Sequence, residues 1–72
     1  MFKIGDCLYY ANRKSKQAEK CIVIERMFQF PLAYIVKNET SGAIMKCYDI
    51  CCFSSEKEAY NDAQIKEERI IY

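Results

Sequence analysis

The sequence predicts a small, mainly β domain of the α+β kind, in which four to five antiparallel strands form a partly open barrel followed by one C-terminal helix. Runs of β-prone residues recur about every 8–12 residues as far as residue 53. Gly, Asn and Pro separate these runs, and from residue 54 the pattern becomes helical. We therefore expect one domain over residues 1–72, with the barrel in 1–53 and the helix in 54–68. A split sheet packed on the helix is the alternative architecture.

The first strand is expected at residues 7–10, directly after a turn at Gly5-Asp6. Glycine tolerates positive φ there, and aspartate bonds the local backbone. Residues 11–17 are polar and lack apolar periodicity, so they predict a basic loop.

The second strand is expected at residues 20–28 and is the longest candidate. Its residues 21–24 form an unbroken apolar run, which predicts burial on both faces where the strand bends between two sheets. Pro31 cannot donate a backbone hydrogen bond, so residues 29–31 should form a connection. A third strand then covers residues 32–37.

A hairpin turn is expected at residues 38–42, because Gly42 can adopt the left-handed conformation that closes such loops. Residues 43–48 should pair antiparallel with the third strand, and residues 50–53 are a candidate short closing strand. Ser55 and Glu58 then have the spacing of a capping box at a helix N-terminus. The apolar face of this helix would carry Ala59, Tyr60, Ala63 and Ile65, and residues 69–72 are either its last turn or a final strand.

Three short motifs carry a family resemblance. They are Phe2-Lys3-Ile4-Gly5-Asp6, then Tyr34-x-Val36-Lys37-Asn38 with its Gly42 turn, and Phe53-Ser54-Ser55-Glu56-Lys57-Glu58-Ala59. In this order they resemble small uncharacterised SH3-like barrel proteins of Gram-positive bacteria and their phages, in which a helix follows the barrel. The resemblance implies an SH3-like fold and a phage or mobile-element origin. It carries over no catalytic residue.

Composition excludes several classes of protein. The chain is 51% hydrophobic and carries 11 basic against 10 acidic residues, a net charge of +1. Such balance is not typical of disordered chains and does not by itself indicate nucleic acid. No apolar run is long enough for a signal peptide or a membrane span, so no membrane partner is expected. Five cysteines, an odd number, predict free thiols in the cytoplasm.

Enzymatic activity is not expected. The chain has no histidine, and it has neither a Gly-rich phosphate loop nor a nucleophile elbow. Glu58 and Asp62 share a helix face, but a solvated face explains them better than an acid/base pair. We expect no cofactor.

A metal site is also not expected, although the cysteines suggest one alternative. Cys47, Cys51 and Cys52 cluster in sequence, but zinc usually takes two paired Cys knuckles and no second pair exists. Cys21 lies in an apolar run, as core cysteines do. Zinc at these three residues is retained only as a minor hypothesis.

Protein binding is the preferred function. Phe28, Phe30, Pro31 and Leu32 form an apolar connection that a small core does not necessarily cover, and exposed apolar clusters mark interfaces. The partner would be a host protein that this module modulates, such as part of a defence system, or a second copy in a homodimer. The competing interpretation is that Phe28 and Leu32 close the end of the barrel.

Nucleic-acid binding is the alternative function. Arg13, Lys14, Lys16 and Lys20 put four positive charges into a short segment, and nearby tyrosines offer rings for stacking. The candidate rings are those of Tyr9, Tyr10, Tyr34 and Tyr48. A solvated loop with half-buried tyrosines explains the same pattern, and we favour it. A small molecule in a tyrosine-lined pocket is a third class.

Overall fold

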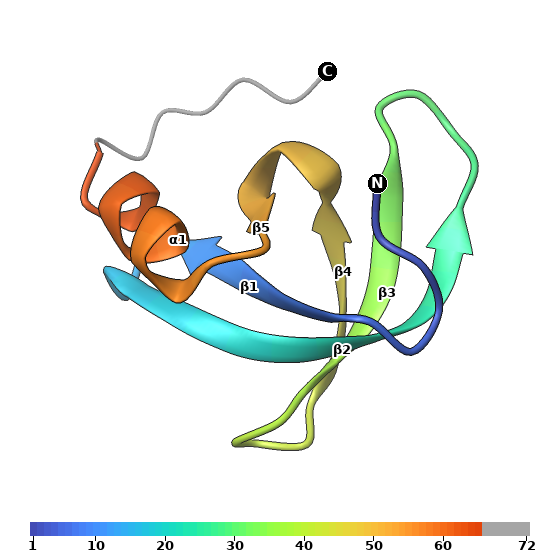
Figure 1. Ribbon diagram of the computed structural model, residues 1–72, viewed down its shortest axis with the longest axis horizontal. Coiled ribbons are helices and arrows are strands. Elements are labelled where there is room, and N and C mark those ends of the chain that lie inside the picture. Colours follow the sequence, from blue (N-terminus) through green and yellow to red (C-terminus); the bar gives the residue numbers. More distant parts are fainter. Residues whose placement is uncertain (66–72) are drawn as a thin grey trace.

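The computed structural model describes residues 1–65. In chain order the elements are β1 (Cys7–Asn12), β2 (Gln17–Met27), β3 (Ala33–Asn38), β4 (Ile44–Tyr48), the 3-10 helix η1 (Asp49–Cys51), β5 (Cys52–Phe53) and α1 (Glu56–Ala63). The expectation of a mainly β domain with one helix after the strands is therefore confirmed (Figure 1).

All five strands belong to one open antiparallel sheet with the order β4-β3-β2-β1-β5. Strand β2 joins the two halves: residues 17–22 pair with β1, and residues 21–27 pair with β3. The sheet is strongly curved, and β2 follows this curvature along its length (Figure 1). Strands β4 and β5 form the two edges of the sheet.

Strand β2 contains a β-bulge within residues 21–24, the segment that was expected to be buried on both faces of the sheet. Val23 pairs with Val36 and Glu25 pairs with Ile35, so Ile24 has no partner in the ladder. Its side chain is 42% exposed, and the expectation that residues 21–24 are all buried is wrong at this position. The extra residue changes which face of the sheet the following side chains point to, as bulges do.

Two apolar clusters lie on opposite faces of the sheet, because side chains alternate along each strand. The larger holds Leu8, Cys21, Val23, Tyr34, Val36, Cys47 and Cys52. We call the face that carries them the core face and the other the outer face. The smaller cluster lies where α1 packs on the outer face, and it is made by Ala11, Ala59 and Ala63 with Tyr9, Ala18 and Phe53 against them.

Helix α1 begins as expected, since Ser55 Oγ accepts a hydrogen bond from the Glu58 backbone N–H. It ends at Ala63, earlier than the expected residue 68, and residues 66–68 lie outside the described residues, as does the question about 69–72. Its buried side chains are small alanines. Tyr60 and Ile65 are 50% and 53% exposed, so assigning them to the buried face was wrong.

The connections follow the local signals in most places. Gly5 and Gly42 both have positive φ, and Gly42 N–H donates to Asn38 O at 2.8 Å, which confirms the two predicted turns. The basic loop is shorter than expected, because β1 continues to Asn12 and β2 begins at Gln17. The expected closing strand 50–53 is largely replaced by η1, and only Cys52–Phe53 pairs with β1. Within residues 1–65, no helix has both the length and the apolar character needed to cross a membrane.

Candidate functional site

The β2–β3 connection, residues 28–32, is divided between surface and core; we call it the connector. Phe28 is 74% exposed and Phe30 is 94% exposed. Pro31 and Leu32 are half-buried, and Leu32 packs against the large core cluster. The idea that Phe28 closes the end of the barrel is therefore wrong, whereas Leu32 does belong to the scaffold.

Contacts from β2 and within the connector hold it in place. The Arg26 guanidinium lies 4.7 Å from the centre of the Phe28 ring, a cation–π distance. Gln29 N–H donates to Met27 O at 2.9 Å, and the Gln29 side-chain amide donates to Pro31 O at 3.1 Å. The exposed rings are thus presented by a hydrogen-bonded segment.

Tyr34 anchors the scaffold near the connector. It is fully buried, its ring meets that of Phe2 edge-on at 5.7 Å, and its hydroxyl donates to Asp49 Oδ1 at 2.6 Å. The Phe2 backbone N–H donates to the same hydroxyl at 3.1 Å. Burial, followed by the hydrogen bond to Asp49, raises the pKa of Tyr34 to about 12. The expectation that Tyr34 offers an exposed ring for stacking is wrong.

The basic segment is only partly available to a ligand. Arg13 Nη2 lies 2.9 Å from Asp62 Oδ1, and both side chains are largely buried, so this pair ties the β1–β2 hairpin to α1. Lys20 Nζ lies 4.0 Å from Glu39 Oε1. Lys14 and Lys16 are exposed in the hairpin turn, where Asn12 Oδ1 accepts the Lys14 and Ser15 backbone N–H groups.

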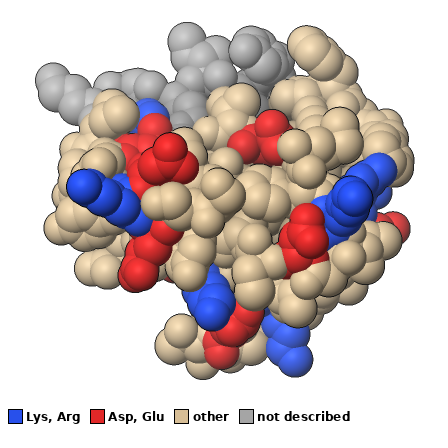
Figure 2. All heavy atoms as spheres, viewed as in Figure 1, with Lys and Arg blue, Asp and Glu red and all other residues tan. Residues whose placement is uncertain are grey.

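The tyrosines near this segment do not form a stacking platform. Tyr9 packs with the small cluster under α1, whereas Tyr10 packs against the large core cluster on the other face. Tyr48 is half-buried, and the Lys46 ammonium lies 5.1 Å from its ring centre. On the face shown in Figure 2, basic and acidic side chains are interspersed, and no large patch of one sign is present. These contacts agree with the interpretation of a solvated loop and half-buried rings.

The clustered cysteines behave as core residues. Cys47, Cys51 and Cys52 are buried, and the Cys52 thiol donates to Tyr48 O at 3.3 Å. The hydrogen bond between the Cys47 and Cys52 thiols, followed by burial, raises the pKa of Cys52 well above its ordinary range. Across residues 1–65, which include every cysteine, no three Cys, Asp or Glu side chains are arranged to hold a metal ion. The minor zinc hypothesis gains no support.

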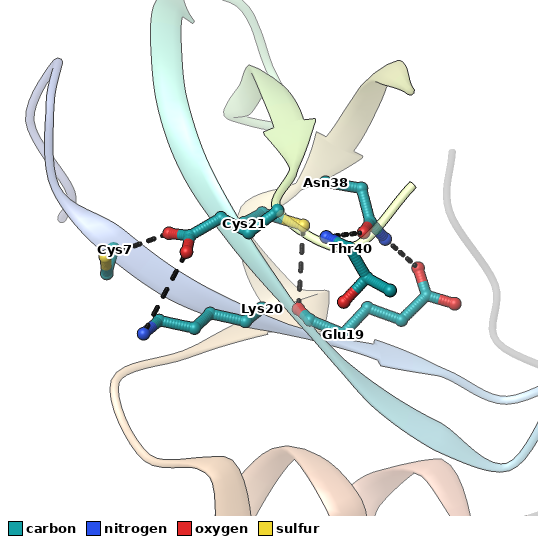
Figure 3. Close-up of polar contacts among 7 residues, drawn as sticks. Cys7, Glu19, Lys20, Cys21, Asn38 and Thr40 are labelled. Atoms are coloured by element: carbon teal, nitrogen blue, oxygen red, sulfur yellow. Dashed lines mark hydrogen bonds and ion pairs between the residues drawn. The ribbon is translucent and has the colours of Figure 1, made fainter. Parts of the chain in front are cut away.

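A polar cluster links the first hairpin to the β3–β4 turn, and the sequence patterns did not reveal it (Figure 3). Glu19 accepts from the side-chain amides of Asn12 and Asn38, at 2.9 and 3.2 Å. Asn38 Oδ1 in turn accepts the Thr40 backbone N–H at 2.8 Å. Asn38 is only 9% exposed, and these bonds satisfy its side chain, so the cluster is a structural support for the turn.

Beside this polar cluster lies Cys7, the exposed cysteine. Its thiol donates to Glu39 Oε2 at 3.4 Å (Figure 3). This bond is the main cause that raises the pKa of Cys7, since the proton is needed to make it. A raised thiol pKa is the opposite of what a nucleophilic cysteine requires.

A hollow of about 750 Å³ opens at this end of the molecule, between β2 and the β3–β4 turn. Its lining mixes polar and apolar surface, and Tyr9 is the one tyrosine among the lining residues within the described chain. This hollow is therefore not the tyrosine-lined pocket of the third class, a small-molecule site.

Comparisons with known proteins give no family assignment: no protein-family model, no curated protein and no solved structure matches this chain.

Proposed function

We propose that this protein is a non-enzymatic binding module that acts by protein–protein contact through its connector. The observation that carries the proposal is the exposure of two phenylalanines, Phe28 at 74% and Phe30 at 94%, on a five-residue segment. Large aromatic side chains are enriched at the energetic centres of interfaces and are costly to leave in water. Leu32 fixes the base of the connector in the core, so the rings are pre-positioned for a partner.

The fold family, the origin and the cellular role of the protein belong to the same proposal. The chain is an SH3-like barrel protein of phage or mobile-element origin, which works in the host cytoplasm and modulates a host factor such as a defence system. The curved antiparallel sheet, the long bulged strand β2 and the helix after β5 support the fold assignment. The sequence motifs that resemble this class support the origin.

The direct test compares what the wild-type protein and a connector variant bind in the native host. A tagged protein is captured from host cells and its partners are identified by mass spectrometry. Phe30→Asp should lose a partner that the wild-type protein captures, because a charge cannot enter an apolar pocket without a large desolvation cost. Its free energy of unfolding should change by less than about 0.5 kcal/mol, as for other exposed positions.

Tyr60→Asp is the matched control, since Tyr60 is a half-exposed aromatic residue on α1. It should retain the partner. Capture of the same proteins by the Phe30 variant would contradict the proposal. Unfolding of that variant would instead assign Phe30 to the scaffold. The homodimer version has its own test, since wild-type protein that sediments as a monomer at high concentration contradicts it.

A further inference from the structure

The outer edge of the sheet at β4 exposes backbone hydrogen-bonding groups. Two bonds determine which residues of β4 face β3: Asn38 N–H donates to Ala43 O at 2.8 Å, and Asp49 N–H donates to Leu32 O at 2.9 Å. Hydrogen-bonded and non-bonded pairs alternate along an antiparallel ladder. The pairs Val36–Met45 and Tyr34–Cys47 are therefore the bonded ones between these ends.

It follows that the N–H and C=O groups of Ile44, Lys46 and Tyr48 point away from β3. Strand β4 is the last strand on this side of the sheet, and β3 is its one neighbour within residues 1–65. In that part of the chain, no bond to another segment uses the backbone of Ile44 or Lys46, whereas Tyr48 O already accepts the Cys52 thiol. The outward-facing backbone N–H and C=O groups of Ile44 and Lys46 are thus available to pair with a further strand.

The exposed side chains on the outer face of this edge are one isoleucine and two lysines. Met45 and Cys47 pack into the core face, so Ile44 and Lys46 stand on the outer face. Ile44 is 58% exposed, and Lys46 is exposed beside the Tyr48 ring. Lys37 of β3, directly opposite Ile44, is exposed as well.

These two lysines lack acidic partners in the described chain. Neither Lys37 nor Lys46 forms an ion pair with a carboxylate of residues 1–65, whereas Lys20 and Arg13 do. The two strands nearest the open edge therefore present two lysines and Ile44 on their outer face, and the acidic Glu25 of β2 lies one strand further away, opposite Ile35. A segment that carries a carboxylate there gains a cross-strand attraction, and one that carries a lysine is repelled.

We propose that β4 is a second docking surface, which takes an extended acidic segment of a partner protein as an added antiparallel strand. The segment carries an acidic side chain opposite Lys46 between two apolar side chains, one opposite Ile44 and one beside Tyr48. Its backbone bonds supply affinity, and the alternating side chains supply specificity. This surface is distinct from the connector and does not depend on the function proposed for it.

A second copy of this chain is a poorer occupant. Self-pairing in the register that uses all three outward-facing residues sets Lys46 opposite Lys46 of the other copy. Like charges directly opposite each other destabilise a strand pair. A lysine on an edge strand is a common means of preventing self-association, and the same charge selects an acidic partner.

The probe is the synthetic peptide Thr-Val-Thr-Glu-Thr-Val-Thr, blocked at both ends, with a second peptide in which Lys replaces Glu. Binding is followed by two-dimensional amide NMR of the full chain. The Glu peptide should slow hydrogen exchange at the Ile44 and Lys46 amides. Lys46→Glu should bind it about five-fold more weakly and should prefer the Lys peptide, which rescues the charge pair.

Three further variants and the oligomeric state of the wild type decide the proposal. Lys57→Glu, the same charge change on α1, should bind like the wild type, and Phe30→Asp should also bind, which separates this surface from the connector. Equal affinity for both peptides, or shifts confined to the connector, would overturn the proposal. So would a wild-type dimer with protected Ile44 and Lys46 amides. Lys46→Thr repeats the test should the glutamate variant fail to fold.

Discussion

At the scale of single residues, the cysteines illustrate how position decides reactivity. Cys7 is exposed and the other four are buried, and of these the apolar sequence neighbourhood indicated burial only for Cys21. Burial raises the pKa of Cys21 to about 12, so this thiol stays protonated and unreactive at neutral pH. Only at Cys7 can a neighbouring side chain be exchanged to change the thiolate fraction without disturbing the core.

Cys7 should react more slowly with iodoacetamide than an ordinary exposed thiol, because its hydrogen bond to Glu39 raises the pKa of the thiol. Glu39→Gln removes the carboxylate and should lower that pKa, which speeds alkylation near pH 8. Mass spectrometry after timed alkylation measures the rate. Glu56→Gln, an exposed change on α1, should leave the rate unaltered. A faster rate for wild type than for Glu39→Gln would contradict the assigned hydrogen bond.

Tyr34 should make the protein lose stability in alkali. Its pKa is raised from an ordinary value of 10.0 to about 12, so the folded protein keeps a proton that the unfolded chain releases. The contribution of Tyr34 to the free energy of unfolding is thus constant below about pH 9 and falls by about 2 kcal/mol as pH rises to about 12. Urea unfolding across this range measures it. Cys21, whose pKa is also raised to about 12, adds a loss of the same sign from a lower starting pH.

The variant Tyr34→Phe separates the contribution of Tyr34 to the alkaline loss of stability from that of Cys21. It should cost about 1–3 kcal/mol at neutral pH, because Asp49 and the Phe2 N–H lose their partner, and it should make the alkaline decline shallower. Tyr60→Phe removes a hydroxyl from a half-exposed position and is the control. An unchanged alkaline decline in Tyr34→Phe would show that Tyr34 does not hold its proton.

At the scale of elements, α1 contacts the sheet through small side chains. Ala59 and Ala63 are fully buried against Ala11, so the helix lies close to β1 and β2. Ala59→Leu should therefore destabilise the fold by about 1–3 kcal/mol through overpacking. Asn61→Leu, at an exposed helix position, should change stability by less than about 0.5 kcal/mol. Denaturant unfolding compares them, and equal losses would argue against close packing of this helix.

Elements that depend on local chemistry were predictable from the sequence. Gly5 and Gly42 adopt the positive φ that their turns need, and Ser55 caps α1 as its spacing with Glu58 indicates. These signals act within a few residues, so no tertiary information is required. Pro31 likewise placed a connection between two strands, but the sequence left open which of its side chains are exposed, as Phe28 and Phe30 are, and which pack into the core, as Leu32 does.

Features that depend on distant contacts were not predictable. Arg13 appears as one charge of a basic loop, but it pairs with Asp62, 49 residues away. Tyr34 has the polar tip of a surface residue, yet Phe2 and Asp49, 32 and 15 residues away along the chain, contact its ring and its hydroxyl. The open edge at β4 depends on the order of the strands, which alternation alone does not fix.

At the scale of the whole molecule, charge and apolar surface are distributed differently. Oppositely charged side chains are interspersed on the viewed face (Figure 2), and the Arg13–Asp62 and Lys20–Glu39 pairs neutralise half of the basic segment. Exposed phenylalanines, in contrast, are concentrated in the connector. This distribution favours protein contact over binding to a nucleic-acid backbone.

Binding to single-stranded nucleic acid should consequently be weak and only mildly dependent on salt. Lys14 and Lys16 are the basic side chains of that segment without a carboxylate partner in residues 1–65, so about two phosphates can be neutralised. The slope of log K against log salt should be about −1.4 for a single-stranded oligonucleotide. Fluorescence anisotropy of a labelled oligonucleotide measures it, and Lys14→Glu with Lys16→Glu should abolish the residual affinity. A slope near about −3 would require four phosphate contacts, which means that Arg13 and Lys20 leave Asp62 and Glu39 on binding. The hairpin would then detach from α1, and the nucleic-acid function would replace protein contact as the better interpretation.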